Sequence, residues 1–204
     1  MLFSAAAGCG TELLKPDFEA RNQLGNQILD LYERPDGFWW QDGDVWDRQQ
    51  KKGIITIKGS QLTAEGGMCG PAGEGDCTAT FSSSVVTVSL PDSPNPVPID
   101  YHMRRNNGAL EVSDAQDNLL VVLKPRSTGA DIFDGQRTLI GTADPDKGGT
   151  LWVSNWDQAT IGSSDGDAPP EIAALAQGAM LDTGTDPAIP GHAIVIAAAL
   201  TWLR

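Results

Sequence analysis

The chain has 204 residues, of which 40% are hydrophobic and 20% are charged, a composition typical of a folded protein rather than a disordered one. It has 27 Asp and Glu against 14 Lys and Arg, so the net charge at pH 7 is −13. This charge argues against binding to DNA, RNA or anionic lipid, because long-range repulsion opposes the encounter.

Residues 1–16 are expected to form a tether, and residues 17–204 a single domain. Cys9 follows Ala6, Ala7 and Gly8, and this string resembles the lipobox of bacterial lipoproteins. The resemblance implies that Cys9 carries a lipid anchor. The string departs from the usual pattern at Ala6, where leucine is common, and the preceding segment is short for a signal peptide. A small-residue terminus after an ordinary cytosolic start is the alternative.

Short runs with β-strand character begin after the tether and are separated by turn signals such as Pro35-Asp36-Gly37. In the first third of the chain, strands are predicted at 18–20, 27–32, 37–40, 45–48, 53–58 and 61–64.

Four aromatic residues lie close together in this region: Phe38, Trp39, Trp40 and Trp46. Adjacent residues of a strand point to opposite faces, so Trp39 and Trp40 cannot both lie in a one-sided core. The cluster is interpreted either as core packing or as a platform on which a sugar, lipid or partner protein stacks.

Three carboxylates, Asp42, Asp44 and Asp47, overlap this aromatic cluster. They are weak calcium candidates, because hard cations prefer several oxygen ligands close together. Their spacing does not match the EF-hand loop, and a chain this acidic is expected to place aspartates in turns. We therefore expect no bound metal and no other cofactor.

Cys69 and Cys77 lie in a glycine-rich loop between two strand-like runs. A hairpin tip brings such residues close enough for a disulfide, which favours an oxidising compartment. Two free thiols in a cytosolic protein are the alternative.

The middle of the chain continues the strand pattern, and Leu119–Leu123 is apolar throughout, which predicts a strand buried on both faces. Asn22, Asp114 and Asp134 each precede a turn and an aliphatic pair, which indicates a repeated hairpin. Strands are predicted here at 78–90, 99–104, 109–113, 119–123, 132–133, 138–142 and 150–154.

The last third has a different pattern. Residues 169–181 are predicted to be helical, with Pro170 and Glu171 suited to a first turn. Residues 193–203 are apolar all round except at Thr201, so this helix must be buried on all sides. It is too short to span a bilayer, which needs about 20 apolar residues. The strand and helix patterns predict an antiparallel sheet, sandwich or barrel that surrounds one hydrophobic helix at the end of the chain.

Enzymatic signatures are few. The sequence has no Gly-x-Ser-x-Gly elbow, and its only histidines are His102 and His192. His102 lies in a predicted strand, where we expect it to face solvent or pair with a carboxylate. His192 is expected at the end of the buried helix.

Hairpins with Asp or Asn turns, followed by an all-apolar C-terminal helix, resemble the tubby C-terminal-like superfamily, which includes LURP-one-related proteins and phospholipid scramblases. The residues that carry this resemblance best are 109–125, 132–143 and 191–202. It implies a twelve-stranded barrel around one central helix, and the fold expected from it is an antiparallel β-barrel of hairpins that encloses a hydrophobic C-terminal helix. The chain lacks the basic cluster with which tubby domains bind phosphoinositides, so the resemblance is used for the fold alone.

These patterns together predict a non-enzymatic lipoprotein of the bacterial cell envelope. Its anchor on Cys9 would hold it to a membrane, and it would act as a binding or scaffold module for a protein or lipid ligand, without nucleic acid. The alternatives are a carboxylate-dependent hydrolase on a β-sandwich or barrel and a cytosolic LURP-one-like protein.

Overall fold

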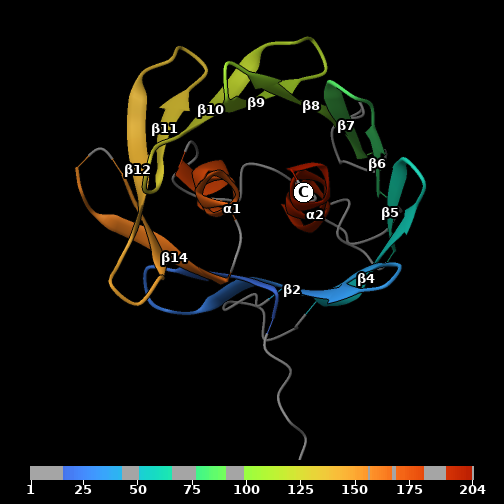
Figure 1. The fold of residues 1–204 in the computed structure, drawn as a ribbon, viewed down its shortest axis with the longest axis horizontal. Coiled ribbons are helices and arrows are strands. Elements are labelled where there is room, and N and C mark those ends of the chain that lie inside the picture. The colour runs from blue at the N-terminus through green and yellow to red at the C-terminus, as the bar shows by residue number, and fades with distance from the viewer. Residues whose placement is uncertain are drawn as a thin grey trace, which may run out of the picture.

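The structure, a computed structural model, describes residues 16–42, 51–65, 77–90, 99–155, 157–166, 169–181 and 192–203. Within these ranges the chain forms one closed barrel of fourteen strands, in which each strand pairs with its neighbours in sequence and β1 closes the ring by pairing with β14 (Figure 1). Every pairing is antiparallel, which confirms the predicted barrel of hairpins.

The strands are β1 (Phe18–Asn22), β2 (Gln27–Arg34), β3 (Gly37–Asp42), β4 (Lys51–Lys58), β5 (Gln61–Glu65), β6 (Cys77–Phe81), β7 (Val85–Leu90), β8 (Ile99–Asn106), β9 (Ala109–Asp114), β10 (Leu119–Pro125), β11 (Ala130–Asp134), β12 (Leu139–Pro145), β13 (Leu151–Asn155) and β14 (Thr160–Gly166).

One turn geometry recurs at hairpins along the barrel. The first residue of the turn accepts hydrogen bonds from backbone N–H groups further along it, and the fourth residue has a positive φ, as in a hairpin loop with a bulge. The repeat predicted at Asn22, Asp114 and Asp134 is confirmed, and Asp146 and Asn155 also begin such turns. The fourth residues are Gly25, Asp117, Arg137, Gly149 and Gln158.

Two helices fill the interior of the barrel: α1 (Pro170–Leu181) and α2 (His192–Leu203). Figure 1 shows both of them end-on within the ring of strands. Residues 194–200 of α2 are all buried, as expected for a helix without a polar face. The sequence predicted one enclosed helix, whereas α1 is enclosed too, because the interior of a barrel widens with strand number.

Polar groups of α1 find partners at the barrel wall. Gln177 is 1% exposed, and its Nε2 donates to the backbone oxygens of Arg21 on β1 and Ser163 on β14, at 2.8 and 3.3 Å. Glu171, also buried, pairs with Arg105 of β8 at 3.2 Å. Gln177 therefore fastens α1 to the seam at which the barrel closes.

Three details of the predicted strands differ. The segment 78–90 is two strands, because Ser82 Oγ bonds to the backbone of Val85 in a tight turn. Leu120 is 37% exposed, so β10 is not buried on both faces along its whole length. β14 was not predicted, because its sequence, TIGSSDG, lacks alternating large apolar residues. The predicted strand 45–48 lies outside the described residues.

Candidate binding sites on the barrel wall

The predicted aromatic platform is divided between the two faces of β3. Phe38 and Trp40 point inward and are 2% and 0% exposed, so they belong to the core and cannot stack on a ligand. Trp39 lies between them in sequence and points outward, which confirms that the adjacent tryptophans face opposite sides. Trp46 lies outside the described residues. The predicted platform of four aromatic residues is therefore corrected. Of the members that the structure describes, only Trp39 is placed to contact a ligand.

Trp39 lies in an outward-facing row with Tyr32 of β2 and Ile54 of β4, its direct partners across the sheet. The rings of Tyr32 and Trp39 have centroids 4.7 Å apart, with an angle of 49° between the ring planes. Ile54 is 40% exposed. We call these three residues the aromatic row.

Asp30 is the next outward-facing residue of β2 beside Tyr32. It is only 5% exposed, and its Oδ1 has no hydrogen-bond partner. Burial raises the pKa of Asp30 from 3.8 to about 6; Arg21 opposes the increase, and Glu19, directly across from Asp30 on β1, adds to it.

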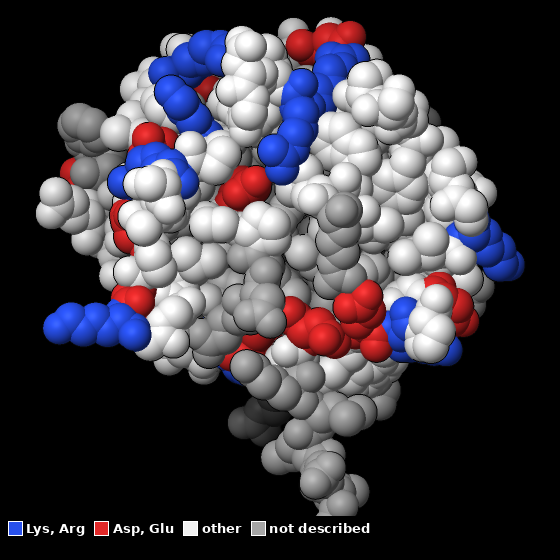
Figure 2. Space-filling view, in the orientation of Figure 1, with Lys and Arg blue, Asp and Glu red and all other residues white. Residues whose placement is uncertain are grey.

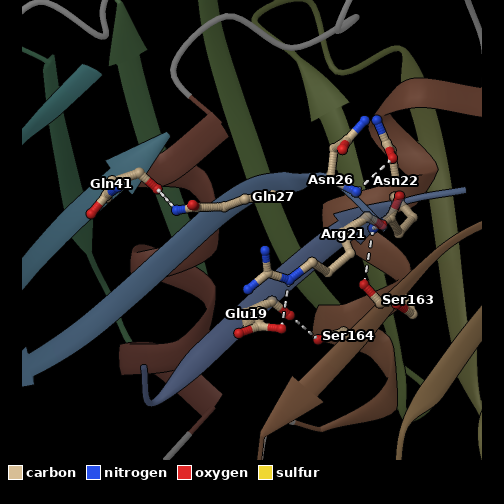
Figure 3. Close-up of polar contacts among 9 residues, drawn as sticks. Glu19, Arg21, Asn22, Asn26, Gln27, Gln41, Ser163 and Ser164 are labelled. Carbon is tan, nitrogen blue, oxygen red and sulfur yellow. Dashed lines mark hydrogen bonds and ion pairs between the residues drawn. The ribbon is translucent and has the colours of Figure 1, made fainter. Parts of the chain in front are cut away.

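Side-chain hydrogen bonds connect β1 to β14 and β2 to β3 in this part of the wall (Figure 3). Arg21 Nε donates to Glu19 Oε1 at 2.6 Å, and Ser164 Oγ of β14 donates to the backbone oxygen of Glu19 at 2.7 Å. On the other side, Gln27 Nε2 donates to the backbone oxygen of Gln41 at 3.4 Å. The Ser164 bond links β14 to β1, the Gln27 bond links β2 to β3, and backbone pairing joins β1 to β2. The carboxylates and the aromatic row therefore lie on one connected part of the wall.

A second feature is a hollow of about 330 Å³ on the outer wall over β8–β11. It is lined by Asn106, Asn107, Ala109, Glu111, Val122, Lys124, Phe133 and Arg137. Its volume lies at the lower end of the range for small-molecule sites.

His102 pairs with a carboxylate, which is one of the two placements expected for it. Its Nδ1 lies 2.9 Å from Asp117 Oδ1, and the same oxygen accepts a bond from Arg104 at 2.8 Å. Hydrogen bonds from His102 and Arg104 lower the pKa of Asp117. Asp117 lies in the turn between β9 and β10, and His102 and Arg104 lie on β8. We therefore infer that these contacts stabilise the turn.

Several predicted site residues lie outside the described part of the chain: Cys9, Cys69, Asp44 and Asp47. Asp42 ends β3, and Cys77 begins β6 with its side chain buried. The lipid anchor, the Cys69–Cys77 disulfide and the calcium candidates therefore stay predictions. Among the described residues, no group of three or more His, Cys, Asp or Glu side chains is placed to hold a metal.

The fold defines a class: a closed antiparallel barrel with two apolar helices as its core. Within the described ranges, neither helix is long and apolar enough to cross a membrane. Comparison of the chain with protein-family models, curated proteins and solved structures finds no match.

Proposed function

We propose that this chain is a non-enzymatic binding module that a lipid on Cys9 tethers to a bacterial membrane, and that its aromatic row contacts a positively charged partner protein. The observation that carries the proposal is the outward Tyr32–Trp39 pair beside Asp30, a nearly buried carboxyl with an unpartnered oxygen. Aromatic faces next to carboxylates attract ammonium and guanidinium groups.

The packing of the core supports a binding role for the wall. Side chains of α1 and α2 fill the described interior, so a ligand is expected on the outside of the barrel. A pocket that gathers two acids would favour the hydrolase alternative, and the hollow over β8–β11 is lined by one acid, Glu111. The tubby-like resemblance implied twelve strands around one helix, whereas the described chain has fourteen strands around two helices. We retain it only as a proposal for the fold family, without its phosphoinositide ligand.

The distribution of charge favours a cationic partner. The net charge of −13 attracts basic segments over long distances. Figure 2 shows Asp and Glu gathered over the β2 side of the barrel end that faces the viewer, whereas Lys and Arg gather on the opposite side. Three acidic residues lie on the β2 side: Asp17 just before β1, Glu33 near the end of β2, and Asp36 just after β2.

Titration of the full chain with hexalysine, followed by calorimetry, tests the binding surface. We expect Trp39→Ala to weaken binding roughly tenfold, because it removes the largest ring of the row. Trp152→Ala is the matched control, since Trp152 is 43% exposed on β13 and lies outside the row. Near-UV circular dichroism confirms that both variants are folded. Equal affinities for the wild type and both variants would refute the proposal, because net charge alone would then explain the binding.

The tether is tested separately with radioactive palmitate in a bacterial host. We expect label on the wild-type chain, recovery in the membrane fraction, and loss of both in Cys9→Ala. If the wild-type chain carries no label, the lipid anchor on Cys9 is refuted. The binding surface is then tested by the titration alone.

A further inference from the structure

The hollow over β8–β11 has an apolar base on a wall that otherwise faces solvent. Val122 of β10 is paired with Glu111 on one side and Phe133 on the other, so the three side chains form one outward row. Val122 is only 4% exposed, and Ala109, at the edge of the hollow, is 8% exposed. Apolar side chains this well covered on an outer wall form a base for the apolar part of a ligand.

The rim of the hollow is positively charged. Arg137 donates to Glu111 Oε1 at 2.7 Å, and Asn106 Nδ2 also lies 3.3 Å from that carboxylate. Lys124, which is exposed two residues along β10 from Val122, forms no ion pair with any residue that the structure describes. The charged residues of the lining are therefore two cations and one anion, in a chain whose net charge is strongly negative.

We propose that this hollow binds a small organic monocarboxylate with a compact apolar body. The apolar body lies over Val122 and Phe133, and the carboxylate pairs with Lys124. A single negative charge matches the single excess positive charge of the lining. This site is separate from the aromatic row and takes a ligand of opposite charge, so it does not depend on the function proposed above.

Phenylacetate is a suitable probe, and the binding is followed by NMR on isotopically labelled full-length protein. We expect saturable shifts of the Val122 methyl and Phe133 ring resonances. Phenethylamine, which has the same ring and the opposite charge, and inorganic phosphate, which has no apolar body, are expected to leave these resonances unchanged.

Variants test the charge requirement in both directions. Lys124→Gln is expected to weaken phenylacetate binding roughly three- to tenfold through the loss of a charged partner. Glu111→Gln is expected to tighten it about threefold, because Arg137 is released and a repulsive charge is removed. Lys58→Gln, an exposed change on β4, is the control and should bind as the wild type does.

The proposal is overturned if phenylacetate leaves the Val122 and Phe133 resonances unshifted at millimolar concentration. It is also overturned if Lys124→Gln and Lys58→Gln weaken binding equally, or if phenethylamine shifts the same resonances as strongly. Amide spectra of each variant confirm that it is folded, so a loss of binding is not a loss of structure.

Discussion

Asp30 is the residue at which burial and charge conflict most directly. It lies on the outer face of β2, yet its side chain is 5% exposed and one of its oxygens has no partner. Arg21 stabilises the charged form, but burial outweighs this effect and the pKa rises from 3.8 to about 6. The folded chain therefore favours the neutral carboxyl at pH values at which the unfolded chain carries it charged.

This difference gives a pH-dependent contribution to stability. The contribution is complete below the unfolded pKa, near pH 4, and is lost as the pH rises through about 6. Asp30→Asn, which is neutral at every pH, should raise the free energy of unfolding relative to the wild type by about 2–3 kcal/mol more at pH 7.5 than at pH 4. Urea denaturation at the two pH values measures this.

The control for this prediction is Asp157→Asn, at an exposed position in the turn after β13. It should change stability by similar small amounts at both pH values. If Asp30→Asn behaves in the same way as this control, the carboxyl is not held in a neutral form by the fold.

For single residues, the sequence predicted those side-chain positions that follow from the alternation of residues along a strand. It placed Trp39 and Trp40 on opposite faces of β3. For His102 it left two placements open, facing solvent or pairing with a carboxylate, and the structure shows the second. It did not indicate Asp30 or Tyr32, because their importance comes from neighbours on β1 and β3. The one sequence signal was an aspartate between two leucines in an otherwise apolar run of β2.

At the scale of elements, the hairpin turns determine how successive strands pair. Asp134 shows the pattern: its Oδ1 accepts from the backbone N–H groups of Gln136 and Thr138 at 2.9 and 2.7 Å. Arg137 then has a φ of 63°, which the closed turn stabilises. Asn22 and Asn155 have the same role as the aspartates, so the turn requires an acceptor oxygen rather than a charge.

Asp134→Ala should therefore lower the free energy of unfolding by about 1–2 kcal/mol, because two backbone donors lose their acceptor. Asp134→Asn retains the oxygen and should restore most of the loss. Gln136→Ala, within the same turn, should change stability little. Thermal or urea unfolding of the three variants measures these differences, and an Asn variant as unstable as the Ala variant would contradict the account.

The sequence predicted the repeat only where an aliphatic pair follows the turn. Residues 144–149 were predicted as a turn, but neither Asp146 nor Asn155 was assigned to the repeat, because each is followed by a different pattern of side chains. β14 was missed for a related reason: its polar strand is held by pairing with β1, more than a hundred residues earlier in the chain. Pairing between strands so far apart in the sequence produces no periodic pattern within either strand.

At the scale of the whole molecule, the barrel and its two helices form one core. The C-terminal helix was predictable, because an all-apolar helix has no face to present to water. The enclosure of α1 was not, since it carries Glu171 and Gln177. Their partners, Arg105 and the backbone of Arg21 and Ser163, come from strands distant in sequence.

Because the interior is filled, ligands are assigned to the outer wall, and this assignment depends on the helices being permanently enclosed. Hydrogen–deuterium exchange of the full chain tests this most directly. We predict that amides of Ala197, Ala198 and Ala199 in α2, and of Ala173 and Ala174 in α1, exchange only through global unfolding, as slowly as the central amides of the strands. Faster exchange of either helix under native conditions would show that the barrel opens or releases it, and would contradict the account.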